Sequence, residues 1–91
     1  MQEKYLEQKL RTLIESKGGM ALKLISPGLA GVPDRLVLLP NGRICFVEIK
    51  KPGMKMRALQ LKRKEQLEAM GFSVYCVDSI ECLKEFMEDF S

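Results

Sequence analysis

Histidine is absent from the 91 residues, and this absence removes many enzyme classes at once. Without histidine the chain cannot form a Ser-His-Asp or Cys-His catalytic pair, a histidine zinc site or a histidine ligand to haem. Cysteine is scarce as well, because Cys45, Cys76 and Cys82 are an odd number at no metal-like spacing. Cys45 and Cys76 lie inside apolar runs, so we expect free thiols that act as small core residues, not disulfides.

Long apolar runs are also missing. No stretch approaches the ~20 apolar residues of a membrane span, and Met1-Gln2-Glu3-Lys4 lacks the apolar run of a secretory signal. We therefore expect no membrane contact and a cytoplasmic location. Apolar residues make up 46% and charged residues 30%, which is typical of a globular protein. At this length the chain can build one core, so residues 1–91 are predicted to form a single domain.

The spacing of apolar residues, with glycine and proline between the runs, divides the chain into seven elements. It predicts helices at residues 2–17, 57–70 and 78–90, and strands at residues 21–25, 34–39, 43–50 and 72–77. Gly71 is placed to end the second helix, and Asp78 with Glu81 resembles a capping box for the third. The order α-β-β-β-α-β-α predicts an α/β fold with one mixed sheet and helices packed on it.

The turn Pro40-Asn41-Gly42 decides the pairing of the second and third strands. A two-residue turn at Asn41-Gly42 would need a backbone N–H that Pro40 lacks. A three-residue loop fits better, with Pro40 and Asn41 at the centre of a type I turn and Gly42 in a left-handed conformation. Leu39 then pairs with Arg43.

This register brings three ionisable residues to one end of the strand pair. Asp34 falls opposite Glu48, and Lys50 lies on the same face because side chains alternate along a strand. The two strands are otherwise almost continuously apolar, which predicts cover on both faces. Two carboxylates held together repel one another, and an oxygen-liganded cation such as Mg²⁺ or Mn²⁺ would remove the repulsion. A structural ion pair between Lys50 and one of the acids is the alternative.

A basic segment follows at once. Residues 50–64 contain no acid and seven basic residues, which are Lys50, Lys51, Lys55, Arg57, Lys62, Arg63 and Lys64. Beside a metal site, such a segment indicates contacts to a polyanion that position the ligand without reading its sequence. A solvated helix face is the alternative. Lys23 and Arg35 are further candidates for phosphate contact, or simply solvated residues.

Together these residues resemble the PD-(D/E)XK nuclease superfamily, and within it the virus-type replication-repair nuclease (VRR-NUC) branch. The likeness rests on Gly31-Val32-Pro33-Asp34, on Phe46-Val47-Glu48-Ile49-Lys50 and on Leu59-Gln60 at the start of the basic helix. The α-β-β-β-α-β order matches the core of this restriction-endonuclease-like superfamily, with one further C-terminal helix.

The resemblance implies an Mg²⁺- or Mn²⁺-dependent phosphodiesterase with no nucleotide cofactor. Asp34, Glu48 and the carbonyl of Ile49 would bind metal, Lys50 would be the catalytic lysine, and Gln60 would orient water, metal or DNA.

The family also uses an acid from the first helix. Glu3 and Glu7 are both candidates, one turn apart, and we favour Glu7 because it lies farther from the fraying end of the helix.

Small proteins of this branch resemble phage-encoded resolvases that act on branched DNA such as four-way (Holliday) junctions. Symmetric cutting of a junction needs two active sites, so this interpretation implies a homodimer. The apolar stripe of the last helix, with Phe86, Met87 and Phe90, is either the dimer face or simply core. A non-catalytic DNA-binding module of the same fold and a small adaptor protein are the competing hypotheses.

Overall fold

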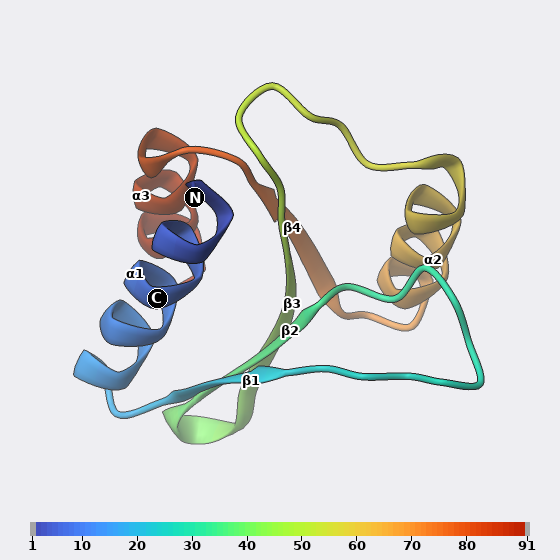
Figure 1. The fold of residues 1–91 in the computed structure, drawn as a ribbon. Coiled ribbons are helices and arrows are strands. Elements are labelled where there is room, and N and C mark those ends of the chain that lie inside the picture. Colours follow the sequence, from blue (N-terminus) through green and yellow to red (C-terminus); the bar gives the residue numbers. More distant parts are fainter. Residues whose placement is uncertain (1, 91) are drawn as a thin grey trace.

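The computed structural model describes residues 2–90 (Figure 1). Three helices and four strands follow the predicted order, which confirms the α/β fold. They are α1 (Gln2–Ser16), β1 (Met20–Lys23), β2 (Arg35–Leu39), β3 (Arg43–Ile49), α2 (Ala58–Ala69), β4 (Ser73–Val77) and α3 (Ile80–Phe90), with a 3-10 turn at Pro40–Gly42. No helix within residues 2–90 is long and apolar enough to cross a lipid bilayer.

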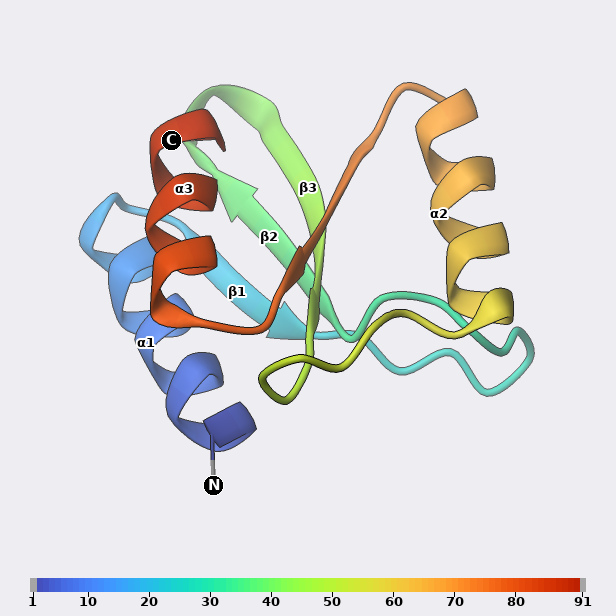
Figure 2. The ribbon, with the colours of Figure 1, turned by 90° about the horizontal axis from the view of Figure 1, so that it is seen from above.

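The four strands form one mixed sheet in the order β1-β2-β3-β4. The pairs β1–β2 and β2–β3 are antiparallel, and β4 runs parallel to β3. A parallel pair needs a crossover connection. Here α2 makes it, and it lies on the side of the sheet opposite α1 and α3 (Figures 1 and 2). The molecule therefore has three layers, with the sheet in the middle.

The core lies between the sheet and the α1–α3 layer. Burial there is nearly complete, because apolar residues of the two helices meet those of the central strands. The main residues are Leu6, Leu10, Ile14, Val37, Cys45, Val47, Ile49, Leu83, Phe86 and Phe90. Since Phe86 and Phe90 face this core, the apolar stripe of α3 is core, and its interpretation as a dimer face is wrong.

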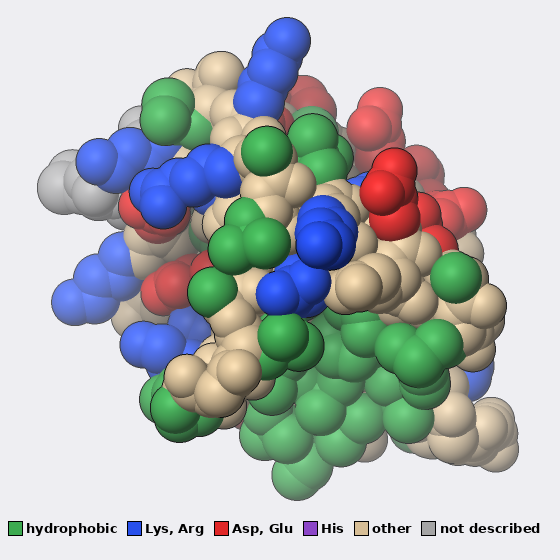
Figure 3. Space-filling view, turned by 90° about the vertical axis from the view of Figure 1, so that its right-hand side faces the viewer, with side chains coloured by type: hydrophobic (Ala, Val, Ile, Leu, Met, Phe, Trp, Pro, Cys, Tyr) green, Lys and Arg blue, Asp and Glu red, His purple; other side chains and the backbone are tan. Residues whose placement is uncertain are grey.

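The other face of the sheet is only partly covered, which corrects the expectation of cover on both faces. There α2 packs mainly against β4 and leaves the part of the sheet toward β1 open. Met20, Leu22 and Ile44 are more than 40% exposed on this face. Figure 3 shows hydrophobic side chains gathered in one continuous area below the basic and polar side chains. Apolar runs therefore predicted the strands correctly but not how much of them would be covered.

The turn before β3 has the predicted register but a different conformation. Leu39 pairs with Arg43, as expected, and Gly42 has the predicted left-handed backbone, with φ 73°. Asn41 is also left-handed, with φ 70°, so it is not part of a type I turn. Glycine adopts this left-handed region freely, and asparagine tolerates it better than most other residues, so Asn41 and Gly42 can both adopt it.

The start of α3 is capped by Ser79, not by Asp78 as predicted. The hydroxyl of Ser79 accepts a hydrogen bond from the N–H of Cys82 at 3.1 Å. Asp78 instead accepts bonds from the thiol of Cys82 and the N–H of Gly53. The cysteines are free, as expected, but Cys76 is exposed, so it is not a core residue. Its strand position, opposite Glu48, faces the less covered side of the sheet.

Candidate active site

The strand register brings Asp34 and Glu48 together at one end of the sheet. The pairing of Arg35 with Val47 continues by one residue to place Asp34 beside Glu48. Two hydrogen bonds link them across the strands. The N–H of Asp34 donates to Oε1 of Glu48, and the N–H of Ile49 donates to Oδ1 of Asp34, each at 3.2 Å. Each acid is therefore held by the backbone of the opposite strand.

Glu48 is the most enclosed member of the site, with only 5% of its surface exposed. Its Oε2 accepts a hydrogen bond from Nε2 of Gln60 at 3.0 Å, and the ammonium of Lys50 lies 3.5 Å from the same oxygen. A buried charge is costly unless it is paired and hydrogen-bonded, and here both oxygens are engaged. The structure thus brings together Asp34, Glu48, Lys50 and Gln60, as the sequence predicted.

Burial and the neighbouring charge act together on Asp34. Its pKa is raised from the ordinary 3.8 to about 6, first by desolvation and then by the charge of Glu48. The Ile49 N–H bond and the charge of Arg35 oppose the shift. A single structural ion pair with Lys50 would need only one acid. The second carboxylate is therefore held at a cost that Lys50 does not fully offset, which is typical of a functional site.

Gly31 fixes the position of Gln60 relative to this pair. Its backbone has φ +86° and lies directly against Leu59, so an added Cβ would lie 2.8 Å from Leu59 Cγ and 2.9 Å from the carbonyl oxygen of Leu59. Only glycine accommodates both constraints. The Gly31–Asp34 loop is thereby packed against the first turn of α2, where Gln60 follows Leu59. The N–H of Arg57 donates to Oε1 of Gln60 at 2.8 Å, which leaves the amide group of Gln60 to face Glu48.

Comparisons with known proteins agree with this geometry. No family model matches the chain. A phage protein named "Putative nuclease p44", from Acyrthosiphon pisum secondary endosymbiont phage 1, is 47% identical over 79 residues, which are 87% of this chain and 85% of the relative. A solved structure described as a VRR_NUC domain superposes with a TM-score of 0.93 and 32% identity, covering 100% of this chain and 99% of that one. The chain belongs to the VRR-NUC family of nucleases.

Nucleases of the VRR-NUC fold generally use divalent metals, and the donor atoms here suit one. Asp34 and Glu48 supply carboxylate oxygens at one point. Ile49, whose N–H bonds Asp34, follows Glu48 directly in the sequence and offers its carbonyl oxygen. Hard oxygen donors are those preferred by Mg²⁺ and Mn²⁺. Residues 2–90 contain no ready-made group of three metal-binding side chains. The site therefore fits a metal held by two carboxylates and a backbone oxygen, completed by water and substrate.

The two acids of the VRR-NUC first helix have different surroundings. Oε1 of Glu7 pairs with a guanidinium nitrogen of Arg35 at 3.2 Å, and the Glu7 charge contributes to the raised pKa of Asp34. Glu3 instead lines a cavity of about 250 Å³ beside Lys50 and Arg57. Glu7 therefore lies on the Asp34 side of the site, and Glu3 lies on the Lys50 side. The preference for Glu7 stays a prediction.

The predicted DNA-contacting residues separate into two groups in the VRR-NUC fold. Lys51, Lys55, Arg57 and Lys62 are exposed after β3 and along α2. Arg63 is engaged within the protein, because its Nε donates to the carbonyl of Ala30 at 2.8 Å and Nη1 to Gln66 at 3.1 Å. It holds α2 to the loop that precedes Asp34, so its first role in this structure is to position that loop.

Sequence reasoning missed two features of the site. The first is the close approach at Gly31, for which the only signal was the glycine itself in the Gly-X-Pro-Asp run. The second is the pair of cations, Lys4 and Arg11, that flank Glu7 on α1 and share a pocket with Arg35. Their spacing from Glu7, three and four residues, is the signal for a shared helix face.

Proposed function

We propose that this chain is a divalent-metal-dependent endonuclease that hydrolyses phosphodiester bonds in DNA, and that its substrate is branched DNA such as four-way junctions. The observation that carries the proposal is the pairing of Asp34 with Glu48 beside a single lysine, Lys50, in a largely enclosed site. A non-catalytic DNA-binding module is the alternative. Such a module would gain nothing from two adjacent carboxylates, which repel the phosphates that it must bind.

Each residue of the proposed site has a role in this proposal. Asp34, Glu48 and the Ile49 carbonyl would hold Mg²⁺ or Mn²⁺, and a metal there would supply charge stabilisation at the phosphate and activation of a water. Lys50 brings its positive charge to the point where negative charge develops on the phosphate. Gln60 keeps the Glu48 carboxylate oriented through its 3.0 Å hydrogen bond. The enclosed position of Glu48 strengthens these charge interactions, because less water screens them.

The basic residues support DNA as the ligand. Lys51, Lys55, Arg57 and Lys62 are exposed and begin immediately after Lys50, so they extend positive charge away from the site. Phosphate contacts of this kind bind duplex and branched DNA without reading a sequence. Selectivity for a junction would then come from the spacing of two sites, not from base contacts.

The junction proposal requires a second copy of the chain, because residues 2–90 contain one such site and symmetric cutting needs two. We define the apolar sheet face as Met20, Leu22, Leu36, Leu38, Ile44 and Phe46, which adjoin one another through the strand pairing. None of these residues is charged, so a polyanion is a poor occupant. A second copy brings an identical apolar area, and a two-fold axis pairs the same surface on both subunits. The proposed assembly is a homodimer joined through this face.

We further propose that residues 1–91 act as a single nuclease domain in the cytoplasm of a bacterial or phage-infected cell. All the groups of the site belong to one sheet and the helices packed on it. The similarity to a phage protein supports the setting.

The substrate is tested with labelled four-way junction, flap and linear duplex DNA of matched sequence in Mg²⁺. We expect paired, symmetric nicks in the junction and slower cutting of the other two, with none in Lys50→Met. Equal cutting of all three would contradict the preference for junctions and leave a general endonuclease. Binding of all three DNAs without cutting in either Mg²⁺ or Mn²⁺ would favour the non-catalytic module.

A further inference from the structure

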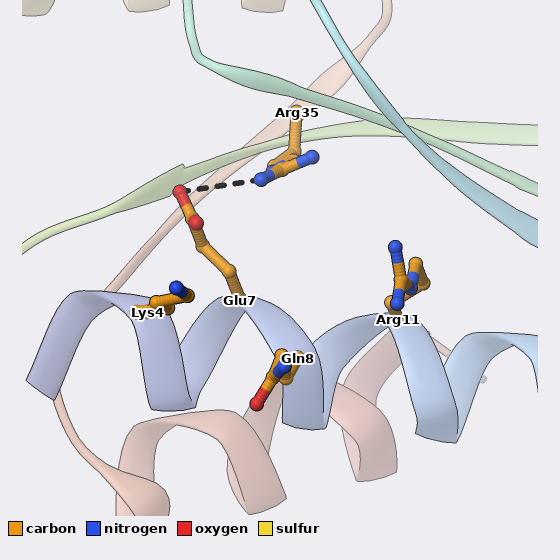
Figure 4. A pocket seen from close by; sticks show the side chains of 5 residues that line it. All are labelled: Lys4, Glu7, Gln8, Arg11 and Arg35. Carbon is orange, nitrogen blue, oxygen red and sulfur yellow. Dashed lines mark ion pairs between the residues drawn. The ribbon is translucent and has the colours of Figure 1, made fainter. Parts of the chain in front are cut away.

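A pocket of about 210 Å³ lies between α1 and the start of β2, next to the proposed active site (Figure 4). It is lined by Lys4, Glu7, Gln8, Arg11 and Arg35. Three of these side chains are cations and one is an acid, so the pocket carries excess positive charge. Glu7 and Arg11 reach from α1 toward Arg35 in Figure 4.

Arg35 has an unused hydrogen-bond donor. Only 16% of its side chain is exposed, and one terminal nitrogen is bound to Glu7 at 3.2 Å. Its Nε is fully buried and has no hydrogen-bond partner among residues 2–90. A buried donor without an acceptor costs about 1–3 kcal/mol, and a native protein usually has a reason to retain one. Arg35 lines the pocket, so a ligand there would meet the exposed part of its side chain.

The chemistry of the pocket selects the ligand. A guanidinium with neighbouring cations matches the charge and the several acceptor oxygens of a phosphate. Glu7 forms an ion pair with Arg35. Lys4 and Arg11 have no acidic partner among the ion pairs of residues 2–90. A carboxylate ligand would offer fewer acceptor atoms to the same three cations. Phosphate is therefore the group that the pocket fits best.

The position relative to Asp34 connects the pocket with DNA. Asp34 and Arg35 are consecutive, so their side chains point to opposite faces of the same strand end. The two sites are close enough for the charges of Arg35 and Glu7 to act on Asp34. A DNA strand that presents one phosphate to Asp34 and Glu48 would thus pass around the end of the sheet.

We propose that this pocket binds a second backbone phosphate of the DNA strand that is cut, with the guanidinium of Arg35, Lys4 and Arg11 as its donors. The inference rests on the proposed nuclease function and deepens it. It makes these three residues substrate-binding groups that set which bond reaches the active site, and it adds them to the basic segment after Lys50. Glu7 has a positioning role here, because it holds one edge of the Arg35 guanidinium.

The test uses the full chain and measures affinity for an uncut four-way junction in EDTA, where no cleavage occurs. The variant Lys4→Ala with Arg11→Ala removes two pocket cations from exposed helix positions. The matched control, Lys9→Ala with Lys17→Ala, removes two exposed cations of the same region that do not line this pocket. We expect the pocket variant to bind about 10-fold more weakly and the slope of log affinity against log salt to fall by about 1, the change expected for one lost phosphate contact. The control should retain most of the affinity.

A third variant and a neutral backbone substitution complete the design. A methylphosphonate at the phosphate next to the cut removes its charge, so it should weaken binding by the wild type but not further weaken binding by Arg11→Ala. Equal losses in the pocket variant and the control would overturn the inference. The inference would also be overturned if the pocket variant lost binding of inorganic phosphate but kept the DNA affinity of the wild type. The pocket would then bind a free anion and not DNA. Failure of the wild type to cut any DNA in metal would instead overturn the proposed function, and the affinity measurement would still report on the pocket.

Discussion

Asp34 and Glu48 are joined by a reciprocal pair of 3.2 Å hydrogen bonds, in which each carboxylate accepts from the backbone of the other strand. This arrangement fixes both side chains without a third residue and keeps them at the end of the sheet. The charge of Glu48 raises the pKa of Asp34, and the hydrogen bond from the N–H of Ile49 opposes that shift. This bond therefore offsets part of the repulsion between the two carboxylates. Both carboxylates therefore have backbone partners before any ligand binds.

Replacing Asp34 by asparagine should stabilise the metal-free protein at neutral pH. The folded-state pKa of Asp34, about 6, lies above its ordinary 3.8, so folding favours the neutral form. The stabilising contribution of this carboxyl is complete below about pH 4 and is lost as the pH rises through 6. After allowance for solvent screening, Asp34→Asn should gain up to about 1 kcal/mol at pH 7.5, or roughly 4–8 °C in Tm.

Thermal unfolding of both proteins between pH 4 and 8 checks this prediction. The two Tm values should converge toward pH 4, and Mg²⁺ should raise the Tm of the wild type more than that of Asp34→Asn. A variant that is less stable than the wild type at pH 7.5 would show that the carboxylate is not held at a cost.

Gly31→Ala should reduce both stability and cleavage. An added Cβ would lie 2.8–2.9 Å from atoms of Leu59, at a backbone conformation that alanine disfavours. We expect a loss of about 1–3 kcal/mol in the free energy of unfolding, and displacement of Gln60 from Glu48. Gly28→Ala is the matched control, because no heavy atom lies within 4 Å of its added Cβ. Denaturant unfolding and cleavage rates are measured for both variants. Equal stability and equal cleavage by Gly31→Ala and Gly28→Ala would contradict this prediction.

Lys62→Glu should weaken DNA binding and flatten its dependence on salt. Lys62 is exposed on α2, within the basic segment that begins beside the active site. Loss of one phosphate contact should reduce the slope of log affinity against log salt by about 1. Lys84→Glu makes the same charge change on α3, on the opposite side of the sheet, and serves as the control. An unchanged slope for Lys62→Glu would mean that α2 faces away from DNA.

Ile44→Glu should convert the proposed homodimer into a monomer. Ile44 is 41% exposed on the apolar sheet face, where a buried charge on each subunit would oppose association. Tyr5→Glu places the same charge at a 52% exposed aromatic on α1, across the sheet, and should leave the assembly unchanged. Analytical ultracentrifugation measures both. A monomeric wild type would contradict the dimer proposal, as would a dimer that persists in Ile44→Glu.

The sequence predicted the pairing of Asp34 with Glu48 because the information for that register is local. Pro40 lacks the N–H that a two-residue turn requires, and this one property sets the register that aligns Asp34 with Glu48. The turn conformation was wrong at Asn41, since several turn types share the same pairing. A register depends on how many residues form the loop, whereas the turn type depends on small energy differences between backbone conformations.

Features that depend on three-dimensional packing were harder to predict. Apolar runs identified β2 and β3 but could not show that α2 covers only part of their outer face, because cover depends on where the crossover helix lies. The sequence predicted Arg63 to be one of several DNA-binding cations. Its hydrogen bond to the carbonyl of Ala30 joins residues 33 positions apart, and sequence spacing does not reveal such a contact. Asp78 and Ser79 are both residue types that cap helices. In the structure the N–H of Cys82 donates to the hydroxyl of Ser79, so Ser79 is the cap.

The most direct test of the account is metal-dependent cleavage by the wild type and by Glu48→Gln. The substitution retains the size of the side chain but removes the charge that would hold a cation. The assay uses labelled four-way junction DNA in Mg²⁺, Mn²⁺ or EDTA, with circular dichroism to establish that both proteins are folded. We expect cutting by the wild type in metal, none in EDTA, and a loss of at least about 100-fold in Glu48→Gln, the scale of removing one charge-stabilising group. Cutting at the wild-type rate by folded Glu48→Gln, or cutting in EDTA, would contradict the central claim that Asp34 and Glu48 form a metal-dependent nuclease site.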